Sequence, residues 1–155
     1  VTQSLGENVS IGFFGYSGKE LSNDPVGIQE EVLNHFTMYG PDLALNFSDK
    51  FVLNLQYLWR TDSRLYSYTG DYMTNTDTQG GFAELIFSPE GDRSKWYLTG
   101  LANYVGSDDN MLDYTSATFH AGYLLRRNMR VVTEFTRVIE PVSYGKISAG
   151  FITAF

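Results

Sequence analysis

Residues 51–60 read Phe-Val-Leu-Asn-Leu-Gln-Tyr-Leu-Trp-Arg, and two kinds of side chain alternate strictly along this run. Successive side chains of a β-strand point to opposite sides of a sheet, so the run separates into two faces. One face is apolar and carries Phe51, Leu53, Leu55, Tyr57 and Trp59; the other is mostly polar and carries Val52, Asn54, Gln56, Leu58 and Arg60. The run therefore predicts a strand whose two faces meet different surroundings.

The same alternation recurs along the chain. Leu43, Leu45 and Phe47 oppose Asp42, Ala44 and Asn46, and later segments repeat the pattern more loosely. Together with a high content of Tyr, Phe and Gly, this pattern predicts an all-β chain. We expect eight strands, at residues 8–16, 34–47, 51–62, 79–88, 95–106, 113–126, 129–139 and 144–155.

The connections between these strands alternate in length. Tight turns are expected at 48–50, 89–94 and 127–128, and longer polar segments at 17–33, 61–78 and 107–112; the short link at 140–143 is an exception. Outer-membrane barrels have short periplasmic turns and longer extracellular loops. We therefore predict a single domain over residues 1–155, an antiparallel up-and-down transmembrane β-barrel with about eight strands in this chain. Because this count is even, the N-terminus is expected at the end that holds the tight turns.

Large aromatic residues lie near the ends of the expected strands. Trp59 and Tyr104 fall at one end, and Phe47, Phe51, Phe87, Trp96 and Phe155 fall at the other. From Phe51 to Trp59 the strand covers about 26 Å at ~3.3 Å per residue, or roughly 20 Å along the membrane normal at a tilt of ~40°. This spacing is close to the apolar band between two aromatic girdles. A soluble barrel or sandwich with its apolar face inward is the competing interpretation.

Composition excludes several classes of protein. A net charge of -7 argues against a nucleic-acid binder, which needs a basic surface. With no cysteine, the chain has no thiolate metal site, thiol nucleophile or disulfide. No run approaches the ~18 apolar residues of a spanning helix. The segment that begins at Val1 has no basic or apolar region, so a signal peptide was either removed or never present.

Two parts of the chain resemble known outer-membrane proteins. Tyr144-Gly-Lys-Ile-Ser-Ala-Gly-Phe-Ile-Thr-Ala-Phe155 resembles the C-terminal strand of bacterial outer-membrane proteins; Ile147, Ala149, Phe151 and Phe155 match its pattern, and Thr153 departs from it. The resemblance implies an outer-membrane location and recognition of this strand by the barrel-assembly machinery. A discontinuous run from Gly80 to Phe135 is similar to the C-terminal strands of larger porin-like proteins, which implies that the chain is part of a larger barrel.

Alternation also predicts which polar residues face the lumen: Asp42, Arg60, Asp62, Glu84, His120, Arg126, Arg130, Glu134 and Lys146. In a closed eight-stranded barrel these side chains would fill the interior. In a larger barrel they would line a water-filled pore, and the mixture of signs predicts no strong ion selectivity. The first expectation for function is therefore the wall of a passive, porin-type channel. The alternative is a complete small barrel with a structural, adhesive or docking role, in which the loop at 61–78 with Tyr66, Tyr68 and Tyr72 would form the contact surface.

Enzymatic chemistry has little support in the sequence. His35 and His120 are the only histidines, and His120 shares one polar face with Ser116 and Thr118 without forming a triad. Asp108, Asp109 and Asp113 cluster in a loop but lack a recognised calcium spacing, so a solvated acidic loop is expected. We expect no enzyme activity, catalytic residue, metal or cofactor. The expected partners are outer-membrane lipid, the barrel-assembly machinery and other outer-membrane chains, with no nucleic acid.

Overall fold

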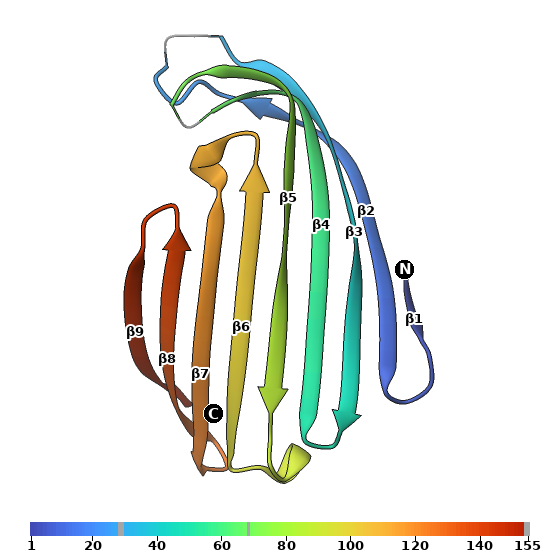
Figure 1. Cartoon of the computed structure of the whole chain (residues 1–155), viewed down its shortest axis with the longest axis vertical. Coiled ribbons are helices and arrows are strands. Elements are labelled where there is room, and N and C mark those ends of the chain that lie inside the picture. The colour runs from blue at the N-terminus through green and yellow to red at the C-terminus, as the bar shows by residue number, and fades with distance from the viewer. Residues whose placement is uncertain (28–29, 68, 154–155) are drawn as a thin grey trace.

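The computed structural model describes residues 1–27, 30–67 and 69–153, and its strands form one antiparallel sheet in the order of the sequence (Figure 1). The strands are β1 (Thr2–Ser4), β2 (Val9–Ser22), β3 (Val32–Ser48), β4 (Phe51–Tyr66), β5 (Tyr72–Phe87), β6 (Trp96–Ser107), β7 (Tyr114–Arg126), β8 (Met129–Glu140) and β9 (Tyr144–Thr153). Two short 3-10 turns, η1 (Gly91–Arg93) and η2 (Asn110–Leu112), are the helical elements of the described residues. Within that part of the chain, no helix has the length and apolar character needed to cross a membrane.

The all-β, up-and-down prediction is confirmed, and each of the eight predicted strands is present. Their extent was underestimated, because most of the segments predicted as loops at 17–33 and 61–78 belong to strands. Pairing continues to Ser22↔Val32 in one hairpin and to Tyr66↔Tyr72 in the other. These extensions carry polar residues on both faces, so they show no alternation of apolar and polar side chains. The backbone hydrogen bonds of a strand form without that alternation. In Figure 1 the upper parts of these two hairpins curve away from the direction of the other strands.

β1 is a ninth strand that the sequence analysis missed. It pairs with β2 from Thr2↔Gly12 to Ser4↔Ser10, and its three residues are too few to show an alternation. Since β1 runs back along β2, Val1 lies beside Phe13, with which it exchanges two backbone hydrogen bonds of 2.8 Å. The prediction that the N-terminus lies at the end with the tight turns is therefore wrong.

The sheet is not closed into a barrel. β1 and β9 are its two edge strands, and no pairing joins them among the described residues. Figure 1 shows the two edges on opposite sides of a single layer. Beyond the short β1, the upper part of β2 is an edge as well. The structure therefore does not show this chain closed into an eight-stranded barrel.

The register separates the two faces along the whole sheet. One face, the aromatic face, contains the pairs Leu43↔Leu55, Phe51↔Phe87 and Phe119↔Phe135. The opposite face, the polar face, contains Asn54↔Glu84 and His120↔Glu134. The buried strand residues of the described chain all lie on the polar face: Gly12, Asn34, Gly40, Asp62, Thr76, Ser116, Gly122 and Val138. Side chains therefore crowd together on the polar face, while the aromatic face is left uncovered.

The three predicted tight turns lie at one end of the sheet, but the lengths of the connections do not sort by end as predicted, because the link at 88–95 is longer than the opposite links at 67–71, 108–113 and 141–143. The connections β1–β2, β3–β4, β5–β6 and β7–β8 lie at the lower end in Figure 1, and the other four lie at the upper end. At the lower end two turns are tied together, since the backbone N–H of Ser88 donates to the carbonyl oxygen of Lys50 at 2.8 Å. In the same place Gly91 has a φ of 58°, and a Cβ there would press on the Asp49 carbonyl oxygen. The lower ends of β3 to β6 thus form one tied unit.

Gly40 provides a test of how closely the backbones of β3 and β4 approach each other. A Cβ at Gly40 would collide with the carbonyl oxygen of Tyr57, which is backbone and cannot rotate away. We expect Gly40→Ala to lower the free energy of unfolding by about 1–3 kcal/mol, as overpacking does, measured by urea titration with tryptophan fluorescence. Gly100→Ala is the matched control, because nothing lies within 4 Å of a Cβ at that position. Equal midpoints for the two variants would contradict the close approach.

Candidate functional site

The polar face holds most of the residues predicted for the lumen. Cross-strand register places eight of the nine on this face: Asp42, Arg60, Asp62, Glu84, His120, Arg130, Glu134 and Lys146. Arg126 lies at the end of β7, where the register with β8 shifts, so its face is not fixed by pairing. Five of the eight gather in two clusters at different heights, Arg60 and Asp62 in one and His120, Arg130 and Glu134 in the other. Asp42, Glu84 and Lys146 lie on the same face outside these clusters.

The upper cluster is centred on Arg60. Its guanidinium donates to the two carboxylate oxygens of Asp62 at 2.8 and 2.7 Å and to Glu20 at 2.6 Å. The guanidinium also lies 4.5 Å from the centre of the Phe36 ring, within the range of a cation–π contact. Asp62 is buried, with 2% of its surface exposed. A buried carboxylate needs such a partner, since an unpaired charge there would be strongly destabilising.

Asn34 completes this cluster from β3. Its amide nitrogen donates to Asp62 at 2.6 Å and to Glu20 at 3.2 Å, and its amide oxygen accepts from the backbone N–H of Arg64 at 3.2 Å. The side chain is 1% exposed and joins three strands. The sequence analysis missed both residues as members of a site. Glu20 fell in the segment predicted as a loop, and Asn34 fell at the first position of the strand that follows it. The same even-numbered alternation, carried on past residue 16 and back to residue 34, would have found them.

Thr76 lies across from Asp62 on β5. It is 1% exposed, and its hydroxyl has no hydrogen-bond partner. The preceding Asn75 has a φ of 52°, in the left-handed region that Asn tolerates better than most residues. Thr76 is therefore held in a crowded polar cluster at a point where the backbone of β5 departs from regular geometry.

The lower cluster surrounds His120. Its Nε2 lies 3.0 Å from the Tyr97 hydroxyl, and its Nδ1 lies 3.5 Å from a carboxylate oxygen of Glu134. The His120 and Tyr97 rings stack with their centres 5.5 Å apart. The Arg130 guanidinium lies over the Tyr97 ring, 5.1 Å from its centre. This cluster therefore interleaves both signs of charge with aromatic rings, as the upper one does.

The polar face shows no arrangement of a nucleophile and a base at His120. Ser116 accepts a hydrogen bond from Asn103, and Thr118 bonds to Thr136 at 2.9 Å. Neither bonds to His120, whose ring nitrogens face Tyr97 and Glu134. In the parts of the chain that the structure describes, no group of three or more His, Asp or Glu side chains is arranged to hold a metal.

The predicted aromatic rows lie on the aromatic face. At the lower end, Phe51 stacks on Phe87 at 4.7 Å, and Phe87 contacts Trp96 at 5.7 Å. Phe47 is 62% exposed beside the irregularity between Asn46 and Ser48. At the upper end, Trp59 stacks on Tyr39 at 5.7 Å, and Tyr104 lies two strands away. Phe155, the remaining member of the predicted girdle, lies outside the described residues.

The tips of the two long hairpins are joined above the upper cluster. The Tyr66 hydroxyl donates to the carbonyl oxygen of Glu30 at 3.0 Å, and the Tyr66 backbone N–H donates to the Ser22 hydroxyl at 3.0 Å. The pKa of Tyr66 is raised by desolvation first and then by repulsion from neighbouring acidic groups, Asp24 among them. Tyr72 contacts Tyr66 at 5.6 Å; Tyr68, the third tyrosine of the predicted contact surface, lies outside the described residues.

Comparison with known proteins adds no relative. No protein-family model, curated protein or solved structure matches this chain. The function must therefore be argued from the two faces of the sheet themselves.

Asp62 is the residue on which the upper cluster depends. We expect Asp62→Ala to lower the free energy of unfolding by about 3 kcal/mol or more, because it leaves the Arg60 charge without its main partner in a crowded site. Urea titration measures this, with Asp92→Ala in the exposed η1 turn as the control. A loss no larger than that of the control would show that the cluster does not hold the strands together.

Proposed function

We propose that the chain forms part of the wall of an outer-membrane β-barrel that acts as a passive, porin-type diffusion channel. The observation that carries this proposal is the reversed polarity of the sheet. Its crowded face buries Asn34, Asp62, Thr76 and Ser116, whereas its uncovered face exposes large apolar and aromatic side chains. A sheet in water favours the opposite arrangement, because covering apolar surface is the main favourable contribution to folding.

The aromatic face is suited to contact with lipid. Phe13, Leu85, Phe119 and Phe135 lie on it with 44–55% of their surface exposed, and other strands add similar residues. In a bilayer such side chains are buried against acyl chains without any protein partner. Aromatic residues at both ends of the apolar band match the two interfaces of a membrane.

The lengths of the strands fit the same surrounding. A tilted strand crosses a bilayer with about 9–11 residues, and β6 to β9 have 10–13. β2 to β5 have 14–17, so their upper ends project past the aromatic row at Trp59. These projecting hairpins stand where long extracellular segments are expected.

The polar face then lines a water-filled pore. Its two clusters hold both signs of charge within hydrogen-bond distance of each other, so neither sign dominates the field along the wall. Such a wall favours passage by size and polarity, with weak selectivity for ions. Glu84, bonded to Asn54 at 2.8 Å, lies between the clusters on this face.

The open sheet favours a larger barrel over a small closed one. Backbone groups at the β9 edge have no partner strand among the described residues, and hydrocarbon does not tolerate unpaired edges. Further strands are therefore needed to close the wall. The last strand, with Phe151 on its aromatic face, is the segment that the barrel-assembly machinery would recognise. A complete eight-stranded barrel that acts only through its loops has no observation in its favour.

Single-channel recording tests the proposal. We expect the intact protein, purified from membranes, to give discrete conductance steps in a planar bilayer with little preference for cations or anions. A bilayer that stays silent after verified insertion would contradict the channel.

A charge reversal in the pore tests which face lines it. Glu84→Lys is expected to shift the reversal potential toward anion preference, because a lumen charge acts on passing ions. Glu90→Lys, in the exposed lower turn, is the matched control. The same reversal potential for both variants would show that the polar face is not the pore wall.

A further inference from the structure

The polar face carries an apolar hollow of about 390 Å³ between its two charged clusters. Most of the residues that line this hollow lie on the polar face by register, among them Met38, Leu58, Gly80, Phe82, Val105 and Tyr114. The hollow begins at Arg60 of the upper cluster and extends toward the lower end of the sheet. It therefore opens to the side that we assign to the pore.

A glycine in the middle of a cross-strand row leaves the floor of the hollow open. The register aligns Leu58, Gly80, Val105 and Tyr114 on four successive strands, β4 to β7. Gly80 places no side chain between Leu58 and Val105. A Cβ at this position would come within 2.7 Å of the Tyr104 carbonyl oxygen, so the close approach of β5 and β6 requires glycine here. The row thus has large apolar side chains on both sides of a gap.

The rows on either side of this gap continue the apolar lining. Met38 lies in the row of Arg60, and Phe82 lies in the row of Gln56. Like the side chains of the middle row, both are partly exposed, so their apolar surface meets whatever fills the hollow. Apolar surface against water is unfavourable, and a wall that only has to be wetted has no need of it. The hollow is therefore suited to a ligand with an apolar part.

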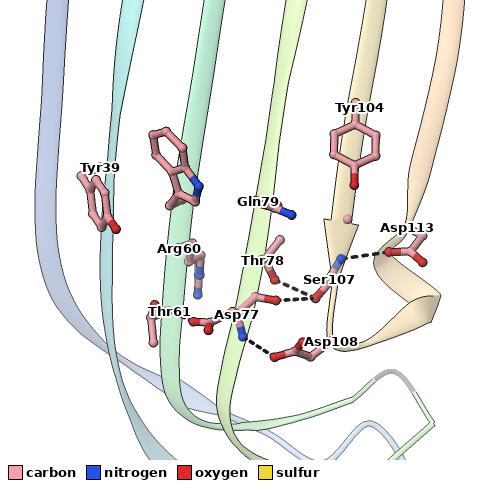
Figure 2. Close-up of a pocket in the computed structure, with 12 residues that line it drawn as sticks. Tyr39, Arg60, Thr61, Asp77, Thr78, Gln79, Tyr104, Ser107, Asp108 and Asp113 are labelled. Carbon is pink, nitrogen blue, oxygen red and sulfur yellow. Dashed lines mark hydrogen bonds between the residues drawn. The ribbon is translucent and has the colours of Figure 1, made fainter.

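Polar groups at the edges of the hollow favour a neutral ligand. The guanidinium of Arg60 is already held by the two carboxylates of the upper cluster. Beside it, the hydroxyl of Thr78 bonds to that of Ser107 at 2.7 Å (Figure 2). At the opposite edge lies Gln56, whose amide has no hydrogen-bond partner among the described residues. An ionised ligand would find no free countercharge, and burial without one is costly. A neutral ligand with an amide or hydroxyl group can pair with Gln56.

We propose that this hollow is a binding site for a small, neutral, aromatic solute of the pore. An aromatic ring packs favourably against the rings of Phe82 and Tyr114 and against the thioether of Met38. A volume of about 390 Å³ lies within the range of small-molecule sites. A polyol would lose hydrogen bonds to water against the aliphatic walls. The inference rests on the proposed function, because the pore brings solutes to this face, and it adds the class of solute that the wall retains.

Methionine methyl resonances report whether the hollow is occupied. Met38 lines it, whereas Met73 lies on the aromatic face, Met111 in η2 and Met129 at a lower turn. The intact protein, isotope-labelled at its methionine methyl groups and held in lipid nanodiscs, is titrated with benzamide and observed by NMR, with Met38→Leu to assign the reporter resonance. We expect a saturable shift of the Met38 resonance and constant positions for the other three. Xylitol, a neutral polyol, should move none of the four.

Paired substitutions test the apolar walls. Leu58→Asn with Val105→Thr keeps side chains of similar size but removes apolar surface, so we expect benzamide to bind about tenfold more weakly. Leu101→Asn with Val132→Thr makes the same two changes on the polar face outside the hollow, and should alter the affinity by roughly twofold or less. Unmoved reference methionines show that each variant is folded. Val105→Thr alone, expected to weaken binding about threefold, serves if the first double variant does not fold.

Failure of the site and failure of the channel give different results. A Met38 resonance that benzamide does not move, or equal weakening in the two double variants, would overturn the site. Binding of benzamide by a protein that gives no conductance in a planar bilayer would support the site and overturn the channel. Conductance without a shift of the Met38 resonance would overturn the site alone.

Discussion

The antiparallel hydrogen-bonded register is the constraint on which this structure depends. From β2 to β9 each strand pairs with its neighbour over most of its length, and side chains alternate between faces without a compensating helix or second sheet. A slip of one residue would move every apolar side chain of a strand to the polar face. The register shifts where strands end, at Asn46/Ser48 and Leu124/Arg126 beside the lower turns and at Thr115/Ser116 at the upper end of β7. Between those ends it fixes which side chains each face of the sheet presents.

This register replaces the usual hydrophobic core with a polar one. Val138 is the buried hydrophobic residue of the described chain, whereas Asn34, Asp62 and Thr76 are almost fully enclosed. Networks of this kind stabilise a fold only when each polar group has a hydrogen-bond partner. A low local dielectric strengthens each hydrogen bond that forms and raises the cost of each buried polar group left without one. Arg60 satisfies Asp62 and Glu20 together, and Asn34 joins them to the backbone of the next strand. Stability then comes from polar contacts on one face and from whatever covers the aromatic residues on the other.

The sequence predicts the strands and faces well and the clusters poorly. Alternation over residues 51–60 is strong because one environment is apolar, so its faces, aromatic ends and turns could be predicted. Glu20 and Thr76 lie where polar residues occupy both faces, so no hydrophobic period indicates a strand there. Asn34 is the first residue of the strand predicted at 34–47, beside the segment predicted as a loop. The apolar hollow at Gly80 is also absent from the pattern of any one strand. It is produced by residues from five strands, and only the cross-strand register brings Met38, Leu58 and Val105 together.

The ninth strand has a further consequence. β1 is short, yet it changes the parity of the sheet, since strands that alternate in direction make β1 and β9 run the same way. Bacterial outer-membrane barrels of a single chain close with an even number of antiparallel strands. A wall that includes β1 can close in this manner only if an odd number of strands lies between its edges. A wall that begins at β2 needs an even number, so the three residues from Thr2 to Ser4 decide whether the additional strands that such a closure would need are odd or even in number.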